Sequence, residues 1–295
     1  MSDECRGVGP EHRNVDALQQ QARAVLERCR SDAGAEEDLD VLEEILQRLP
    51  GERCLYERGY VAYQRGQDEE AAEYLYRAGW ETFEGSKSPP PCEEVYPWIL
   101  PFIIEPLPEL WCQLAAEFRK AWPDSAAFCL LRGYAELYND PETAVKYFAD
   151  CLQADAACWP AAAEMGNMYF DAKKWKWAFD CYEHALPYAP AGEQSILHFN
   201  AALCMNRLEE WRLAAEHYAA CLKRDPEFEY ARANLGKCLT RCGEYVQAVE
   251  VLDEAIQRGE GSYEVRRSLA ASLRRLRRFP EAAEVLRGGP RGKPH

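Results

Sequence analysis

Apolar residues recur along most of this chain at spacings of three and four residues, the pattern of helices with one buried face. Two such series lie near the N-terminus: Val15, Leu18, Ala22, Val25, Leu26 and Cys29, and then Leu39, Leu42, Ile45, Leu46 and Leu49. Pro50 and Gly51 interrupt the pattern. We therefore predict one pair of helices in this segment, which serves as an N-terminal cap or as a degenerate repeat.

Farther along the chain, a set of small and large positions returns with a period near 34 residues. An alanine opens each predicted second helix: Ala71, Ala144, Ala178, Ala214, Ala248 and Ala282. Eleven or twelve residues earlier stand the small residues Gly59, Gly133, Gly166, Ala202, Gly236 and Ala270, and four residues later the large residues Leu75, Phe148, Tyr182, Tyr218, Leu252 and Leu286. Because small and large positions interlock where helices pack closely, the pattern predicts an array of helical hairpins.

The spacing resembles that of the tetratricopeptide repeat family. The segment EMGNMYFDAKKWKWAFDCYEHALPYAP, residues 164–190, carries almost the whole family pattern of Leu-Gly-like, tyrosine, alanine, aromatic, alanine and proline positions. The resemblance extends from Glu52 to Arg287, about four fifths of the chain. It implies an all-α fold, a superhelical solenoid of antiparallel helix pairs.

This register divides the chain into expected segments. They are a disordered N-terminus at 1–13, the helical pair at 14–50, a first tetratricopeptide repeat at 52–85, a proline-rich insertion at 86–91, a degenerate repeat at 92–125, repeats at 126–158, 159–192, 195–228, 229–262 and 263–287, and a disordered tail at 288–295. In the degenerate repeat Trp111 occupies the alanine position, and Pro97, Pro101, Pro106 and Pro108 interrupt the first helix. Three interpretations of this degenerate repeat stay open: a hinge, a docking loop, or a repeat that has lost the family pattern but still packs against its neighbours.

Composition and charge narrow the classes of function. The formal net charge is −15, which argues against general binding of nucleic acid, because phosphate contacts require clustered lysine and arginine. No apolar run is long enough to span a bilayer, and the acidic N-terminus does not resemble a signal peptide. The thirteen cysteines are odd in number and include no CxxC pair, which favours reduced thiols. We expect a cytoplasmic protein without membrane insertion.

The sequence gives little sign of catalysis. Its five histidines show no HExxH spacing, and neither a GxSxG motif nor a glycine-rich phosphate loop is present. We expect no enzyme activity, no cofactor and no metal site. Cys238 and Cys242 could form half of a zinc site, but a second pair is missing, so packing is the favoured interpretation. Core packing is likewise favoured over a ligand cage for Trp175, Trp177 and Trp211.

The family resemblance implies that first helices line a concave, peptide-binding groove. The positions expected to face it are Tyr134, Asn167, Phe170, Phe199, Asn200, Leu203, Asn206, Arg207, Tyr230, Lys237, Arg241, Arg267, Arg274 and Arg275. The C-terminal end of this groove is basic, since nine lysines and arginines stand against four acidic residues from Glu260 onward. We name Lys237, Arg241, Arg267, Arg274 and Arg275 the basic wall.

Some family members hold the acidic C-terminal tails of heat-shock chaperones with two asparagines and three basic residues. Asn167 and Asn200 match the asparagines, but Ala163, Tyr230 and Asn234 stand where basic residues are needed. Without those cations the charge-assisted hydrogen bonds are lost, so we do not expect that function.

We expect instead a non-enzymatic scaffold or adaptor that binds a peptide or helix of another protein, with acidic residues beside an apolar anchor. Two alternatives stay open: a chaperone of a secretion or assembly substrate, and a regulatory subunit that docks on an enzyme. No polar capping helix follows Arg287, so self-association through the C-terminal end of the solenoid is a further expectation.

Overall fold

A computed structural model of the chain describes residues 10–31, 36–51, 53–67, 118–137 and 139–287, with isolated positions from 70 to 95 and at 116. All regular secondary structure in these residues is helical. The chain divides into two compact units, Met1–Asp155 and Ala156–His295. None of the described helices combines the length and the apolar character that crossing a membrane requires.

The first unit begins with the predicted helical pair. Its described helices are α1 (Pro10–Ser31), α2 (Glu36–Gln47), α3 (Leu55–Gln64), α7 (Ala126–Glu136) and α8 (Pro141–Ala154). The apolar series of α1 and α2 pack together, with Leu42 and Ala22 fully buried and Val61 of α3 against them. Residues 10–13, predicted to be disordered, belong to α1, because proline is well tolerated in a first helical turn.

Polar groups close the helix ends in this unit. The guanidinium of Arg58 donates to the carbonyl oxygen of Leu46, in the last turn of α2, at 2.6 Å, and to that of Leu49, just beyond the helix, at 3.0 Å. The hydroxyl of Ser125 caps α7 by accepting from the backbone N–H of Phe128 at 3.1 Å. These bonds satisfy backbone groups that a helix cannot pair internally.

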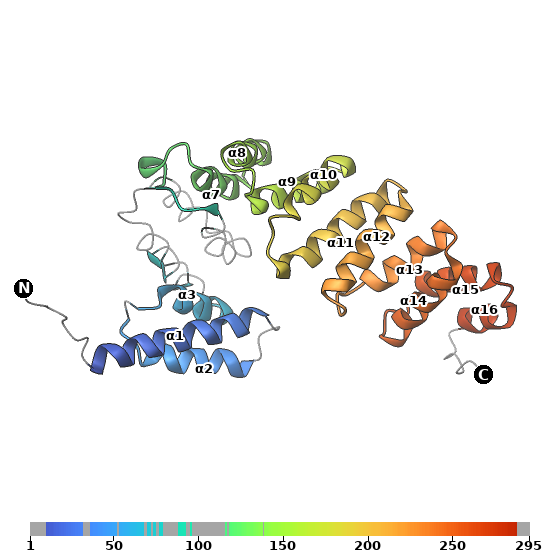
Figure 1. Ribbon diagram of the computed structural model, residues 1–295, viewed down its shortest axis with the longest axis horizontal. Coiled ribbons are helices and arrows are strands. Elements are labelled where there is room, and N and C mark those ends of the chain that lie inside the picture. Colours follow the sequence, from blue (N-terminus) through green and yellow to red (C-terminus); the bar gives the residue numbers. More distant parts are fainter. Residues whose placement is uncertain are drawn as a thin grey trace, which may run out of the picture. The chain divides into compact units, whose positions relative to one another are not determined.

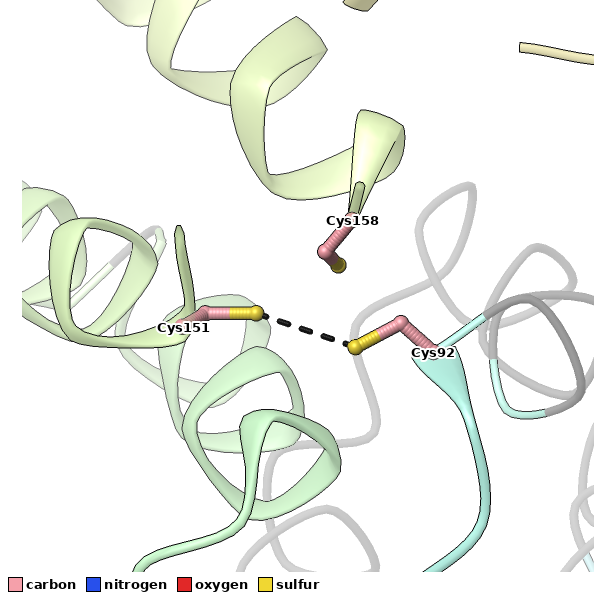
Figure 2. Close-up of side chains that lie close together, drawn as sticks. All are labelled: Cys92, Cys151 and Cys158. Carbon is pink, nitrogen blue, oxygen red and sulfur yellow. Dashed lines mark hydrogen bonds between the residues drawn. The ribbon is translucent and has the colours of Figure 1, made fainter. Parts of the chain in front are cut away.

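Helices α7 and α8 show the predicted fit of small and large residues. Gly133 faces Phe148, and a Cβ atom at Gly133 would lie 2.4 Å from the phenylalanine ring. Cys151, on the same helix as Phe148, is also fully buried. Its sulfur lies 3.8 Å from that of Cys92, which is buried too (Figure 2). Trp111 and the four prolines of the degenerate repeat lie outside the described residues, as does the tail at 288–295.

The described residues of the second unit form four helical hairpins in succession (Figure 1). Their helices are α9 (Trp159–Asp171), α10 (Trp175–Ala185), α11 (Ala191–Arg207), α12 (Trp211–Arg224), α13 (Ala231–Cys242), α14 (Tyr245–Gln257), α15 (Tyr263–Arg275) and α16 (Phe279–Leu286). Each helix packs against the next, and α13 also contacts α15. This arrangement follows the sequence register, with α9, α11, α13 and α15 as first helices and the others as second helices.

The turn inside each hairpin is the same. Lys173, Glu209, Gly243 and Arg277 occupy equivalent positions and all have left-handed φ angles, between 58° and 85°. The next backbone N–H then returns to a carbonyl five residues earlier, for example from Lys174 to Tyr169 at 2.8 Å and from Arg278 to Leu273 at 2.8 Å. This closure ends the first helix and reverses the chain within three residues.

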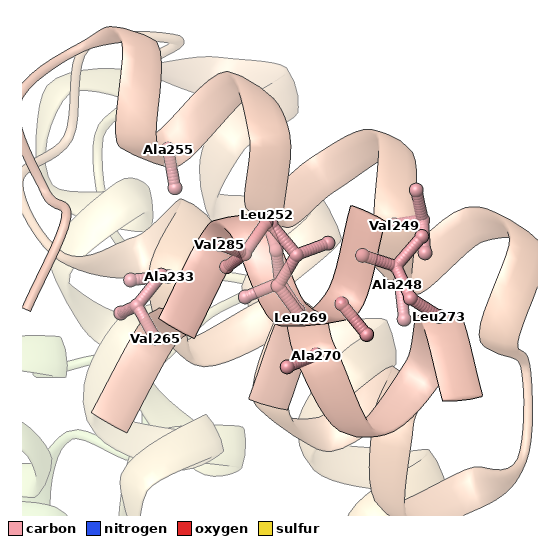
Figure 3. Packing of buried hydrophobic residues seen from close by; sticks show 11 residues of the cluster. Ala233, Ala248, Val249, Leu252, Ala255, Val265, Leu269, Ala270, Leu273 and Val285 are labelled. Carbon is pink, nitrogen blue, oxygen red and sulfur yellow. The ribbon is translucent and has the colours of Figure 1, made fainter. Parts of the chain in front are cut away.

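Close helix approach at the small positions builds the core. A Cβ atom at Gly166 would lie 2.6 Å from Tyr182, and one at Gly236 would lie 2.4 Å from Leu252. Leu252 also belongs to the buried cluster that joins α13 to α16, together with Leu269 and Leu273 (Figure 3). The sequence prediction of interlocking small and large residues is therefore confirmed at these positions.

Candidate protein-binding surface

The first helices of the second unit carry four equivalent positions spaced so that they share one helix face. We name these positions the first-helix face. They are Ala163, Asn167, Phe170 and Asp171 in α9, Phe199, Leu203, Asn206 and Arg207 in α11, Ala233, Lys237, Thr240 and Arg241 in α13, and Arg267, Ala271, Arg274 and Arg275 in α15. All are at least partly exposed except Ala233, and exposure is greatest in α15.

At the α9 end, Asn167 is held by the protein itself. Its Oδ1 accepts a hydrogen bond from the hydroxyl of the buried Tyr182 at 2.8 Å, and its Nδ2 donates to Glu164 at 3.2 Å. A ligand at this position would compete with both bonds. This asparagine therefore has a structural role in addition to its place on the predicted groove.

An aromatic group lies in the middle of the face. The ring of Phe199 packs against Tyr218, with ring centres 5.6 Å apart, and against Phe228, with ring centres 4.9 Å apart. Tyr230, two residues beyond Phe228, is 58% exposed and has a left-handed φ of 63° just before α13. The sequence prediction included Phe199 and Tyr230 but missed Phe228, which lies in a connection outside the expected first helix.

Three arginines of the face stack on aromatic rings. Arg207 lies over Trp175, Arg241 over Trp211, and Arg275 over Tyr245, at 6.0, 5.4 and 6.0 Å from the ring centres. Each pair joins the end of a first helix to the start of the preceding second helix. The repeat thus orients these cations through cation–π contacts.

Tryptophans at the start of second helices were predicted to be core residues, and this is wrong for Trp177. Trp177 is 55% exposed, packs edge-on against Tyr169, and has the ammonium of Lys174 5.1 Å from its ring. Trp175 is half-buried against Phe170 instead. Two residues along a helix turn through about 200°, so the two rings point to opposite sides of α10.

Within the basic wall, the remaining cations differ in their partners. Lys237 donates to Asn234 at 3.3 Å. Arg267 lies 3.7 Å from Glu264 in an ion pair whose side chains are both 60% exposed. Arg274 is exposed. A surface pair of this kind is weak and yields readily to another carboxylate.

Polar links join successive first helices beside this face. The Sγ of Cys238 donates to Oδ1 of Asn206 at 3.8 Å, and the hydroxyls of Thr240 and Ser272 lie 2.9 Å apart in the equivalent position one repeat later. Cys238 is 1% exposed, whereas Cys242 is half-buried on a neighbouring groove. The sequence missed Thr240 and Ser272, because single hydroxyls carry no periodic signal.

Two other predicted groove residues, Asn200 and Tyr134, are not part of the first-helix face. Asn200 is half-buried on α11. Tyr134 belongs to the first unit, where it is 5% exposed and packs edge-on against Phe148 at 5.3 Å. Its ring is thus part of the α7–α8 packing, because the large position of α8 covers it.

A histidine pair lies between α11 and α12, with His217 buried and His198 half-buried. The Nδ1 atoms of His198 and His217 are 3.1 Å apart, so one nitrogen must donate and the other accept. Burial lowers the pKa of His198 to about 4, and nearby Arg224 adds to the effect. Burial also lowers the pKa of His217, against the opposing influence of Glu183, 3.7 Å away.

Known proteins resemble the chain in sequence pattern and in fold. The sequence model of the tetratricopeptide repeat matches residues 208–261. YrrB, described as a TPR protein with an unusual peptide-binding site, aligns with a TM-score of 0.53 and 19% identity over 59% of this chain and 89% of its own. PilF of Pseudomonas aeruginosa aligns with a TM-score of 0.50 and 15% identity over 66% and 88%. No curated protein sequence matches the chain.

At such identities a structural likeness shows the fold alone. The matched segment 208–261 includes α12, α13 and α14, whose turns and small positions recur in the neighbouring hairpins. Residues 208–261 therefore match the tetratricopeptide repeat, and the described residues of the chain have the all-α fold of helical hairpins seen in proteins of that kind.

Proposed function

We propose that this chain is a non-enzymatic adaptor that binds an extended or helical segment of a partner protein across the first-helix face of the second unit. The observation that supports this most is the position of an aromatic group, Phe199 and Phe228, on a face whose C-terminal end carries exposed cations. Aromatic anchors surrounded by polar groups are typical of the energetic centre of protein interfaces.

The charge of the face favours an acidic partner segment with an apolar anchor. Arg267, Arg274 and Arg275 are exposed on α15, while the whole chain has a net charge of −15. An acidic ligand is repelled by the body of the protein and attracted at this wall, which orients its approach. The apolar anchor would then contact Phe199 and Tyr230. Charges at the rim act mainly on association rate, and the anchor acts on dissociation.

The test uses a partner that co-purifies with the tagged full chain. Binding to the variant Arg267→Glu with Arg274→Glu is compared with binding to the parent at two salt concentrations. We expect association at low salt to slow about tenfold or more and its salt dependence to flatten. Phe199→Ala should instead speed dissociation.

A matched control is Arg212→Glu, which reverses one exposed cation on the second helix α12 and should leave this binding unchanged. Unchanged association and salt dependence in the double variant would contradict the basic wall as the binding site. Arg275→Lys keeps the charge but loses the geometry over Tyr245, so it separates charge from stacking.

The identity of the co-purified protein also separates the alternatives. An unstable client that aggregates without this chain would support the chaperone of a secretion or assembly substrate. A stoichiometric enzyme would support a regulatory subunit. The proposal includes a cytoplasmic location, which the buried, reduced thiols of Cys204, Cys221 and Cys238 favour.

Self-association at the C-terminal end is a second candidate, supported by Phe279. This residue opens α16 at the position of Trp175, Trp211 and Tyr245, and it is 61% exposed. A second copy could cover this ring as arginines cover the earlier ones. Sedimentation of the parent and of Phe279→Ser checks this, and a parent that stays monomeric at high concentration would contradict it.

A further inference from the structure

A groove opens between the second helices α12 and α14, with α13 as its floor. Its cavity volume is about 570 Å³. Ala215, Leu235, Leu239 and Val251 give it an apolar lining. Leu235 and Leu239 lie on the side of α13 opposite to Lys237, because two residues along a helix turn through about 200°. The groove is therefore separate from the first-helix face.

The preceding groove, between α10 and α12, is filled by its own side chains. Phe179, at the position of Ala215, is 8% exposed and packs edge-on against His217, at the position of Val251, with ring centres 5.5 Å apart. The ammonium of Lys176 lies 5.0 Å from the Phe179 ring. In the following groove, between α14 and α16, Val249 and Val285 occupy the same two positions and are buried.

The middle groove holds smaller side chains at these two positions than the first groove does, and at Ala215 a smaller one than the third groove does. An alanine replaces a phenylalanine, and a half-buried valine replaces a histidine. Because Phe179 and Ala215 occupy the same repeat position, the first groove indicates which kind of side chain fits beside Ala215: an aromatic ring. The position of Lys176 is held by Arg212, which lines the open groove.

The rim of the open groove is acidic. Glu216, Glu244 and Glu250 line it and are exposed, with Arg212 as the one basic residue among its described lining. Burial raises the pKa of the Cys242 thiol, which is also influenced by Arg212, Glu244 and Glu216. These charges therefore converge on the mouth of the groove. A cation entering beside an apolar group would meet complementary charge there.

We propose that this groove binds a segment of a partner protein that presents an aromatic side chain beside lysine or arginine. The ring takes the place that Phe179 fills in the preceding groove, and the cation faces Glu216, Glu244 and Glu250 on the rim. The site takes a ligand of opposite charge to the one expected on the first-helix face. It does not depend on that proposal, because the two sets of residues do not overlap.

The probe is a blocked, alanine-rich helical peptide with lysine and phenylalanine three residues apart, as Lys176 and Phe179 are. A control peptide carries glutamate in place of the lysine. Titration into the full chain, followed by methyl NMR, should shift the signals of Leu235, Leu239 and Val251. The glutamate peptide should bind about tenfold more weakly, because it faces the acidic rim.

Two variants locate the site. Ala215→Phe should fill the groove and abolish these shifts, and its melting temperature checks that the fold persists. Glu216→Gln with Glu250→Gln changes exposed positions only and should weaken the lysine peptide about tenfold. Arg274→Glu, on the first-helix face, should leave the binding of both peptides to this groove unchanged. Absence of shifts at several millimolar peptide, equal binding of both peptides, or undiminished binding to Ala215→Phe would each overturn the proposal.

Discussion

The hairpins α9–α10 and α11–α12 have the same backbone turn but different buried contacts. Tyr182 and Tyr218 occupy the same large position, and both are buried. The hydroxyl of Tyr182 donates to Asn167, whereas the hydroxyl of Tyr218 has no hydrogen-bond partner among the described residues. The reason is that Leu203 stands where Asn167 stands one repeat earlier. The small and large positions thus define the hairpin, and the other positions can vary around them.

The largest expected effect on stability comes from enlarging a buried small residue at a position that both hairpins share. Ala214 is fully buried at the start of α12, so Ala214→Leu should overpack the hairpin and lower the free energy of unfolding by about 1 to 3 kcal/mol. Ala219→Leu, on the exposed side of the same helix, is the control and should be close to neutral. Chemical denaturation of both variants measures the difference, and equal stability would contradict the assigned register.

The contrast between the two tyrosines predicts a smaller effect. Tyr182→Phe removes a buried hydrogen bond and leaves Asn167 Oδ1 without its donor, so it should cost about 1 kcal/mol. Tyr218→Phe removes a hydroxyl that is buried without a partner, so it should be neutral or stabilising. The two melting temperatures should therefore move differently. A similar loss in both variants would show that Tyr218 has a bond in solution.

The histidine pair is a second difference, because Ala162 and Cys181 replace His198 and His217 in the preceding hairpin. The lowered pKa of His198, about 4, lies below the usual value near 6.5, so the unfolded chain binds more protons between these two values. Stability should fall as pH drops from 6.5 towards 4. Because His198 is only partly buried, we expect less than about 1 kcal/mol from it.

Unfolding of the parent and of His198→Gln at several pH values measures this contribution. The variant should lose less stability than the parent across the same interval. Parallel curves would contradict the assignment of the pH dependence to this pair.

Most of the fold was predictable because repetition makes a weak signal strong. One hairpin pattern is ambiguous, but the small positions at Gly133, Gly166 and Gly236 each face the predicted large residue. The N-terminal pair was equally visible, since its apolar residues follow helical spacing and form one cluster. The proline-interrupted repeat could not be predicted in the same way. Its prolines interrupt the helical spacing of apolar residues, and such a prediction depends on that spacing.

The candidate surface was predictable only as a set of positions. The family resemblance predicted that Arg207, Arg241 and Arg275 lie on one face, but their stacking on Trp175, Trp211 and Tyr245 depends on side chains from the preceding hairpin. The open groove was missed for a related reason. An alanine at position 215 appears ordinary in a helix, and only comparison with the packed ring of Phe179 reveals the space beside it.

The proposal that first helices bind the partner is tested most directly by hydrogen–deuterium exchange of the full chain with and without its co-purified partner. We predict slower amide exchange in α11, α13 and α15, with α12 and α14 changed less. Arg267→Glu with Arg274→Glu should reduce the protection of α15 first. Protection confined to α12 and α14 would contradict the proposed function and place the partner on the acidic groove instead, and unchanged exchange in every first helix would contradict the first-helix face as a binding site.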